Sequence, residues 1–517
     1  MKVHFIGIGG IGVSALARYY LAKGHKISGS DLNSSEITEA LKKMGVKIFI
    51  GPHKCLRFHL KQTDLVIYSP AISPNNPEIV TAKKGVIKCQ SYPEALGELT
   101  KEYFTIAVCG THGKSTITAM ISLILIKAGL NPTVIVGTKL REFDDSNFRM
   151  GGYPKKNLKF KIKNLKSLII EADEHFASFL NYWPKIIVLT SLEPDHLDFY
   201  KNFKNYVSAF KKFISHLPKD GILIANKDDG NISKFLNSSH NNFSTAVKKL
   251  LYYSLRQKKA EKLKKILKVP GEYNVQNALA ALTVARVLKI PDKISFKALS
   301  EYKGTWRRFE VVEADKRGYL RGFTPKITLI SDYAHHPTKV RVTLKAAREK
   351  FPRRKIWLVY QPHQYQRTYY LFDDFVKIFQ QALNKSWINK LIITDIFDVA
   401  GREEKEIKKK VNSEKLVASI KYKVSSKKKE EILYIPTIKE TADYLKKNLR
   451  GGPPARTSSR RSRAGEVVIV MGAGDVYKLA DLLIDPVRSS QETRFNLDSF
   501  GRIRKYGTSN GVDKKQK

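Results

Sequence analysis

Cysteine is scarce in this sequence, with three residues among 517. An odd and sparse set of cysteines excludes the disulfide framework of small secreted proteins and is typical of a reducing compartment, so we expect a cytoplasmic location. Long apolar runs are also absent, because no stretch approaches the ~18 residues that a membrane-spanning helix needs. We therefore expect no membrane partner. The segment Phe5–Ala17 resembles a signal peptide, but its glycine spacing favours another interpretation.

Acidic residues are few beside basic ones, with 48 Asp+Glu against 93 Lys+Arg and a net charge of +45. Such an excess suits anionic partners, namely nucleotides, nucleic acids or membrane surfaces. No zinc-finger, RRM or other nucleic-acid module accompanies the charge, so a nucleic-acid partner is not favoured. A basic nucleotide-binding protein associated with nucleic acid remains an alternative of a different class. No repeat of solenoid length occurs.

The N-terminal segment, residues 1–98, follows the pattern of a Rossmann-like domain. A short predicted strand, Val3–Ile6, leads into a loop with the spacing G-x-G-x-x-G and then into a predicted helix, Val13–Lys23. An acidic residue follows the next predicted strand, about 20 residues on. Such a loop binds nucleotide phosphates, and the acidic side chain can bond a ribose hydroxyl. An NAD dehydrogenase would share this motif but would leave the second glycine loop unexplained. The expected contacts are Gly7, Gly9, Gly12 and Asp31.

The second glycine loop is the most informative stretch of the chain. Gly110-Thr111-His112-Gly113-Lys114-Ser115-Thr116 follows a predicted buried strand, Phe104–Val108, and precedes a predicted helix, Ile117–Ile126. In this arrangement the turn amides and the helix N-terminus bind phosphate oxygens, the lysine adds positive charge, and the hydroxyl can ligate Mg²⁺. Val108 stands where the full P-loop has a further glycine, so this is a shorter form. The alternative is an ordinary strand-to-helix turn with an exposed lysine.

Strands alternate with helices through the rest of the chain, whose length predicts roughly two to four domains. This alternation favours mostly parallel sheets with helices on both faces, and ligands of such sheets lie beyond the carboxyl ends of the strands. We predict an α/β fold with three domains. They are a Rossmann-like domain at 1–98, a central P-loop-type ATPase domain with a mostly parallel sheet at 99–309, and a Rossmann-like C-terminal domain at 310–484.

Two basic segments interrupt the third domain, and we interpret the region of about 403–465 as carrying basic insertions. Lys405–Glu431 is rich in lysine, which predicts a solvated insertion or a long charged helix. Arg450–Gly465 is rich in glycine, proline, serine and arginine, which predicts a flexible loop. The polar stretch at 485–517 lacks periodicity and is predicted to be disordered.

Seven motifs occur in a fixed order along residues 1–484. They are Gly110–Thr116, Glu171–Glu174, Glu193–Asp198, Pro270–Asn277, Trp306–Glu310, Asp332–Pro337 and Met471–Asp475. Together they resemble the Mur ligases, the ATP-dependent amino-acid ligases of peptidoglycan synthesis. The Asp332–Pro337 motif, with His363 and Arg367 further on, separates the chain from most sister ligases.

The resemblance implies a reaction in which L-alanine is joined to the lactyl carboxylate of UDP-N-acetylmuramate. ATP phosphorylates the carboxylate, the alanine amine attacks the acyl phosphate, and phosphate leaves. Both the carboxylate and the triphosphate are anionic, so cations must neutralise and align them. The resemblance therefore implies ATP and Mg²⁺ as cofactors. The alternative within the family is a recycling ligase that joins a whole murein peptide to the same sugar nucleotide. We expect a monomer or homodimer whose domains close on ligand binding.

The resemblance also implies roles for individual residues. Lys114 would contact the β- and γ-phosphates, and the implied catalytic set is Lys114, Glu171, His196, His335 and Arg367. The implied metal ligands are Ser115, Glu171 and His196. The implied nucleotide contacts are Gly110, Thr111, His112, Gly113, Lys114, Ser115, Thr116, Asn274, Asn277, Arg308 and Asp332. The implied amino-acid pocket is Tyr333, His335, His363 and Arg367.

Several of these residues have plainer interpretations from the sequence alone. Glu171 would be a solvated strand end, and His196 a hydrogen-bonding side chain, because Mg²⁺ prefers oxygen ligands. Asn274 and Asn277 would cap a helix, and Arg308 would form an exposed salt bridge. The neighbouring His335 and His336 suggest a zinc site, although adjacent residues at a strand end diverge.

Three positions depart from the family pattern. Ser191 stands where the family usually has asparagine, Tyr273 where it has histidine, and Gln364 where it often has arginine. Gln364 cannot supply a cation, so the amino-acid pocket keeps one expected charge rather than two. Weaker alanine binding, or a different amino acid, is therefore open.

Overall fold

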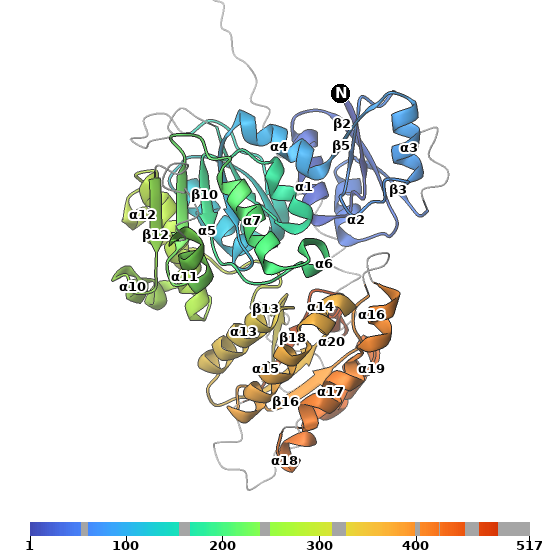
Figure 1. Cartoon of the computed structure of the whole chain (residues 1–517), viewed down its shortest axis with the longest axis vertical. Helices are drawn as coiled ribbons and strands as arrows, with labels where there is room; N and C mark the ends of the chain where they lie inside the picture. Colours follow the sequence, from blue (N-terminus) through green and yellow to red (C-terminus); the bar gives the residue numbers. More distant parts are fainter. Residues whose placement is uncertain are drawn as a thin grey trace, which may run out of the picture.

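The computed structural model of the chain describes residues 1–52, 60, 62–154, 166–237, 249–312, 327–398, 404–422, 424–449 and 465–483. The structure contains three β-sheets in succession along the chain, and helices surround each of them (Figure 1). Most strand pairs are parallel, so the α/β class predicted from the sequence is confirmed. The predicted disordered tail and residues 450–464 of the predicted loop lie outside the described residues.

The first sheet has five parallel strands in the order β3-β2-β1-β4-β5. Its helices are α1, Ile11–Ala22; α2, Glu36–Lys43; α3, Pro77–Lys84; and α4, Tyr92–Glu102. The glycine loop lies between β1 and α1, as the sequence predicted. The strands are β1, Lys2–Ile6; β2, Lys26–Asp31; β3, Lys47–Ile50; β4, Leu65–Tyr68; and β5, Lys88–Ser91.

The middle sheet has seven strands in the order β12-β11-β10-β6-β9-β7-β8, and the edge pair β7–β8 is antiparallel. Its strands are β6, Phe104–Cys109; β7, Thr133–Leu140; β8, Ser146–Arg149; β9, Ser167–Glu171; β10, Ile186–Leu189; β11, Ile222–Asn226; and β12, Lys249–Tyr253. Its helices are α5, Lys114–Lys127; α6, Leu197–Tyr200; α7, Phe203–Ile214; α8, Gly230–Asn237; α10, Lys259–Ile266; α11, Glu272–Val287; and α12, Asp292–Glu301, with 3₁₀ turns η2, Arg141–Phe143, and η3, His175–Asn181.

The third sheet has six strands in the order β13-β14-β18-β15-β16-β17, so its last strand lies at the centre. The strands are β13, Glu310–Val312; β14, Ile327–Asp332; β15, Lys355–Tyr360; β16, Lys390–Ile393; β17, Ile432–Tyr434; and β18, Glu466–Met471. The helices are α13, Pro337–Lys350; α14, Tyr365–Tyr370; α15, Phe372–Asn384; α16, Lys405–Lys410; α17, Ser413–Tyr422; α18, Ser426–Lys429; α19, Ile438–Asn448; and α20, Lys478–Leu483.

The interpretation of Lys405–Glu431 as a solvated insertion or one long charged helix is wrong. The segment forms the three helices α16, α17 and α18, and α17 packs into the third hydrophobic core. Leu416 and Ile420 are fully buried there. These two side chains lie four residues apart and therefore share one helix face, which outweighs the surrounding lysines.

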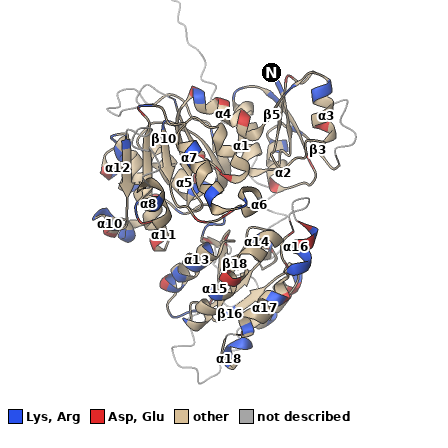
Figure 2. Ribbon diagram, viewed as in Figure 1, with Lys and Arg blue, Asp and Glu red and all other residues tan. Residues whose placement is uncertain are grey.

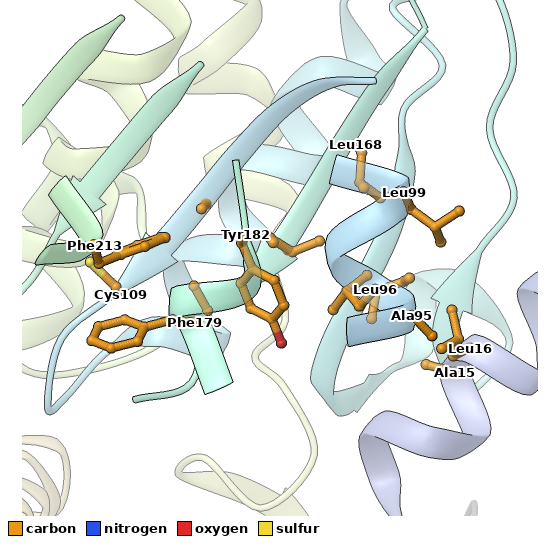
Figure 3. Packing of buried hydrophobic residues seen from close by; sticks show 14 of the residues in the cluster. Ala15, Leu16, Ala95, Leu96, Leu99, Cys109, Leu168, Phe179, Tyr182 and Phe213 are labelled. Atoms are coloured by element: carbon orange, nitrogen blue, oxygen red, sulfur yellow. The ribbon is translucent and has the colours of Figure 1, made fainter. Parts of the chain in front are cut away.

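One hydrophobic core joins the first sheet to the middle sheet. It contains Leu16 from α1 and Leu96 from α4 together with Leu168 from β9 and Phe179 from η3, and Figure 3 shows these side chains in one continuous cluster. A polar contact reinforces this junction, since Arg18 donates to the Asn147 side chain at 2.9 Å. The first two sheets therefore pack as one block.

The segment that connects the middle sheet to the third sheet, residues 304–309, contains unusual backbone. Gly304, Arg307 and Phe309 have φ values of 101°, 56° and 50°. Residues other than glycine rarely adopt positive φ values. Arg307 is buried and donates to the carbonyl oxygen of Gly474 at 3.0 Å. Its guanidinium also lies 4.5 Å from the centre of the Tyr477 ring. The C-terminal half of this connection is thus fixed to the third sheet.

Basic residues occur in all three parts of the described structure. Figure 2 shows blue segments on α3, α10 and α18, three helices that lie at different ends of the molecule. Among the described residues, no helix is both long enough and apolar enough to cross a membrane.

Candidate active site

A cavity of about 970 Å³ lies between the middle and third sheets and extends to the first glycine loop. Most of the site residues predicted from the sequence line it. These are Gly12, Thr111, His112, Gly113, Lys114, Ser115, Thr116, Glu171, His196, Asn274, Asn277, Arg308, Asp332, Tyr333, His335, His363 and Arg367. Gly7, Gly9, Asp31 and Gly110 do not line it. Residues from three separate sheets therefore face one space.

The loop at residues 110–113 connects β6 to α5, and its glycines are required by geometry. Gly110 has a φ of 123°, and a Cβ atom there would lie 2.2 Å from the hydroxyl of Thr190. A Cβ atom on Gly113 would lie 2.6 Å from the side-chain oxygen of Asn277, so α11 approaches the loop closely. Ser191 accepts a hydrogen bond from the backbone N–H of His112 at 3.0 Å. Ser191, although it departs from the family pattern, therefore stabilises the loop.

Lys114 begins α5 and points into a set of carboxylates. Its Nζ donates to the Gly110 carbonyl oxygen at 2.9 Å and to Glu174 Oε2 at 2.7 Å, with Asp173 at 3.6 Å. Burial acts to lower the pKa of Lys114, but Glu174 and Asp173 outweigh it and the pKa is raised. Glu174 is fully buried, and burial raises its pKa. Lys114 therefore brings a positive charge to the cavity.

Ser115 and Glu171 are brought together at the start of α5. The Ser115 hydroxyl donates to Glu171 Oε1 at 2.9 Å, and Oε2 of the same carboxylate accepts from the Gly137 N–H at 2.8 Å. The interpretation of Glu171 as a solvated strand end is wrong, because both of its oxygens have partners. A hydroxyl and a carboxylate oxygen side by side are donors that suit Mg²⁺.

His196 lies in a separate cluster with Asp173 and Glu174, whose ligand atoms all fall within 4.8 Å of one another. Its Nε2 is 3.9 Å from Glu174 Oε1, and its ring stacks on His175 at 4.2 Å between centroids. His196 has a φ of 53°, a strained value for a residue with a side chain. The structure therefore places this histidine near carboxylates but not beside Ser115 and Glu171.

Asn274 and Asn277 lie inside α11, whose N-cap is Gly271, so the interpretation of them as helix caps is wrong. Asn274 donates to the Pro270 carbonyl oxygen at 2.7 Å. Asp332 closes β14, and its carboxylate accepts from the N–H groups of Phe309 and Ala334 at 2.7 and 2.8 Å. Burial raises the pKa of Asp332.

Arg308 packs against an aromatic ring rather than in an exposed salt bridge. Its guanidinium lies 4.9 Å from the centre of the Tyr333 ring, a favourable cation–π geometry. Both residues line the cavity. Arg308 therefore lines the same cavity as Lys114.

Arg367 crosses from the third sheet to the middle one. Its Nη2 donates to Asp195 Oδ1 at 3.2 Å, and its Nη1 lies 3.2 Å from His363 Nδ1. Arg367 and Asp195 are 8% and 5% exposed, so this ion pair is buried. His335 lies nearby and is also buried, and burial lowers its pKa. All four residues line the cavity.

His335 and His336 point to different places, so they do not form a two-histidine metal site. His336 faces His112, with 5.2 Å between ring centroids. Glu193 lies between the two domains at this point, 3.1 Å from His112 Nε2, and accepts from the Thr338 hydroxyl at 2.7 Å. This cluster ties the start of α13 to the phosphate loop.

Asp31 contacts the first glycine loop itself. Its Oδ2 accepts from the N–H of Gly9 at 2.8 Å. The carboxylate thus holds the loop in place at the end of β2, and a direct contact of Asp31 with a ribose remains a prediction.

The other two family departures lie on the third-domain side. Tyr273 is partly buried against the third core, and burial raises its pKa. Gln364 has a φ of 69° and donates its backbone N–H to the Phe397 carbonyl oxygen at 3.1 Å. Its side chain adds no positive charge to the cavity.

Sequence reasoning assigned no role to several charged residues in or beside the cavity, among them Glu174, Glu193, Asp195 and Lys339. The first three belong to acidic motifs at the ends of β9 and β10, where every carboxylate was a candidate and spacing alone could not rank them. Lys339 follows the His335-His336-Pro337 run, and a lone lysine carries no sequence signal. Only its position in the fold identifies it.

Three family models match the chain in succession. The catalytic domain of the Mur ligase family matches residues 2–104, the Mur ligase middle domain matches 108–285, and the glutamate ligase domain of Mur ligases matches 307–474. The UDP-N-acetylmuramate–L-alanine ligase of Acetivibrio thermocellus is 36% identical, covering 93% of this chain and 95% of that protein. The enzyme of the same name from Clostridium tetani is 35% identical, covering 93% and 98%.

Solved structures show the same fold. The UDP-N-acetylmuramate–alanine ligase of Thermotoga maritima is 25% identical with a TM-score of 0.69, covering 96% of this chain and all (100%) of that one. A murein peptide ligase from Psychrobacter arcticus is 21% identical with a TM-score of 0.63, covering 93% and 98%.

Proposed function

The chain belongs to the Mur ligase family, and on this premise we propose that it joins L-alanine to the lactyl carboxylate of UDP-N-acetylmuramate with ATP. The observation that carries the proposal is the shared cavity, which is lined by Lys114 of the middle domain, Arg308 of the connecting segment and Arg367 of the third domain. The two curated relatives are named for this activity. They are 35–36% identical to this chain, and the match covers 95–98% of their own length.

The cavity supports a two-step amide synthesis. The sugar-acid carboxylate and the triphosphate repel each other, so their approach requires cations on several sides. Lys114 and Arg308 supply charge on the nucleotide side, and Arg367 supplies it on the other. Phosphorylation of the carboxylate creates a leaving group, and the alanine nitrogen then displaces phosphate from the acyl carbon.

The donor set near α5 fits a magnesium ion. Ser115 and Glu171 would hold it, and a bound Mg²⁺ ion would neutralise charge on the β- and γ-phosphates. His196, with Asp173 and Glu174, offers a second set of donors. The imidazole nitrogen is less typical for Mg²⁺ than the carboxylates around it.

Arg367 is suited to bind the carboxylate of the incoming amino acid. A planar guanidinium pairs with a carboxylate through two parallel hydrogen bonds. Arg367 already pairs with Asp195 in this structure, so the amino acid would share the guanidinium with that carboxylate. His335, His363 and Tyr333 complete the pocket.

The proposal also covers organisation and location. The first domain, 1–98, would bind the uridine diphosphate through Gly7, Gly9, Gly12 and the nearby Asp31. The central domain, 99–309, would bind ATP through residues 110–116, Asn274 and Asn277. The third domain, 310–484, would contribute Asp332 to ATP binding and would carry the amino-acid pocket. We place the protein in the cytoplasm, where ATP and nucleotide sugars are available, as a monomer or homodimer.

The alternatives differ in what they predict. A recycling ligase would accept a murein tripeptide in place of alanine, and the two curated relatives reported above do not carry that name. A nucleic-acid-associated protein would show salt-sensitive DNA or RNA binding. The spread of basic side chains in Figure 2 is typical of a lysine-rich surface.

The test is phosphate release with UDP-N-acetylmuramate, ATP and Mg²⁺ against L-alanine, glycine, L-serine and the murein tripeptide. We expect turnover with L-alanine and loss of turnover in Lys114→Met. Turnover only with the tripeptide would favour the recycling ligase, and no turnover with any acceptor would contradict ligase activity.

A further inference from the structure

Lys339 lies in the cavity, although no motif or family resemblance assigned it a role. It is the third residue of α13 and lines the cavity on the third-domain side. Its side chain is partly buried. The preceding residue, Thr338, donates to Glu193 of the middle domain, so the first turn of α13 is held against the phosphate loop.

Charged groups surround Lys339 on both sides. Lys114 and Arg308 influence it from the nucleotide side, and Arg367 from the amino-acid side, while Asp195 is the carboxylate that acts on it most strongly. Lys339 therefore shares one cavity with the cations proposed to bind the nucleotide and with the cation proposed to bind the amino acid, and a phosphoryl group must pass between these two groups of residues.

Lys339 lacks the partners that the neighbouring cations have. Lys114 pairs with Glu174, and Arg367 pairs with Asp195. Within the part of the chain that the structure describes, the Lys339 ammonium forms neither a hydrogen bond nor an ion pair.

A buried ammonium surrounded by other cations is stabilised by an anion. Burial lowers the pKa of Lys339 to about 7, and Arg308, Lys114 and Arg367 add to this effect while Asp195 opposes it. An ammonium normally titrates near 10.5. A bound phosphate would supply the missing negative charge and restore the full positive charge of the lysine.

We propose that Lys339 contacts the phosphoryl group during its transfer from ATP to the sugar-acid carboxylate, and is thereby a catalytic residue. This inference rests on the proposed function. In the transfer, a carboxylate oxygen forms a bond to the γ-phosphorus while the bond from that phosphorus to the β–γ bridging oxygen breaks. ADP leaves with that electron pair.

Lys339 donates hydrogen bonds in this step and gives up no proton. The charge of the transition state is spread over the three equatorial oxygens of the phosphoryl group. Lys114 approaches them from the middle domain, and Lys339 approaches from the third domain. Because Lys339 is on the third domain, phosphoryl transfer would be efficient only while α13 lies against the phosphate loop.

The experiment measures acyl-phosphate formation without any amino acid. Enzyme in excess is mixed with UDP-N-acetylmuramate, Mg²⁺ and labelled ATP, and ADP formation is followed by rapid quench. In Lys339→Met we expect ADP to form about 100-fold more slowly, as for loss of one transition-state donor. Lys339→Arg, which keeps the charge, should recover at least about 10-fold of that loss.

The matched control is Lys345→Met, because Lys345 is exposed on the same helix. It should form ADP at the wild-type rate, and thermal unfolding should show all variants folded. Wild-type speed in Lys339→Met would overturn the inference. A raised KM for L-alanine with unchanged ADP formation would also overturn it, because Lys339 would then bind the amino-acid carboxylate. If the wild-type enzyme formed no ADP, the proposed function itself would fail.

Discussion

Lys114 has a structural role besides its proposed catalytic one, and this makes its removal a sharp test of the structure. The ammonium is 12% exposed, and its partner Glu174 is fully buried, at 2.7 Å. Replacing the lysine by methionine keeps the bulk of the side chain but leaves a buried carboxylate without its cation. We therefore expect Lys114→Met to be both inactive and less stable.

The size of the effect follows from the burial of the pair. Removing one partner of a buried ion pair costs roughly 3–5 kcal/mol. We take about 3 kcal/mol, because Tyr206 still lies 3.3 Å from the other carboxylate oxygen and Lys114 is not fully buried. For a domain the size of the central one, each kcal/mol of lost stability lowers the melting temperature by roughly 2–4 °C. The expected decrease is therefore about 6–12 °C.

Calorimetry of the wild-type protein and three variants would test this. The double variant Lys114→Met/Glu174→Gln removes the buried charge and should recover at least about 1.5 kcal/mol, a coupling expected for groups in direct contact. Lys127→Met is the control, because Lys127 ends the same helix and pairs with Glu301 at 42% and 46% exposure. Its change should stay below about 1 kcal/mol. Equal stability of Lys114→Met and Lys127→Met, or no recovery in the double variant, would refute the reasoning.

Three further predictions concern other parts of the chain. Gln364→Gly should raise stability by about 1 kcal/mol, because Gln364 holds a φ of 69° that glycine adopts freely; lower stability in chemical unfolding would contradict this. Asp195→Asn should raise the KM for the amino acid at least about fivefold, because Asp195 orients the guanidinium of Arg367 through their buried pair. An unchanged KM in steady-state kinetics would show that this pair has no part in amino-acid binding. Burial raises the pKa of the Cys109 thiol, so iodoacetamide at pH 8 should label Cys109 only after unfolding, and mass spectrometry showing native labelling would disprove its burial.

Much of the fold was predictable because the buried strands carry their own signal. Ile106 and Val108 are apolar and continuous with their neighbours, as parallel strands covered on both faces are, and the glycines that follow mark the turn. The family was predictable for a related reason and is confirmed, since its motifs sit at the carboxyl ends of those strands. The edge strands β8 and β12 were missed, because partly exposed edges have mixed composition.

The site was predictable by residue type but not by pairing. The sequence placed Lys114, Glu171 and Arg367 in one constellation, and the cavity contains them. It could not show that Lys114 pairs with Glu174 rather than with Glu171, because both carboxylates lie within one short motif. It could not identify Lys339 either, since the position of this residue in the cavity depends on how α13 is oriented against the middle domain. Local charge density also misled the interpretation of α17, whose buried face is short.

The position of β18 at the centre of the third sheet has a consequence for biosynthesis. The strands β14 and β15 both pair with β18, which ends at residue 471, so neither can complete its pairing until that residue has left the ribosome. The two earlier sheets contain all their strands by residue 253. A nascent chain would thus carry two finished sheets and one split sheet with two unpaired edges, which are sites for aggregation or chaperone binding.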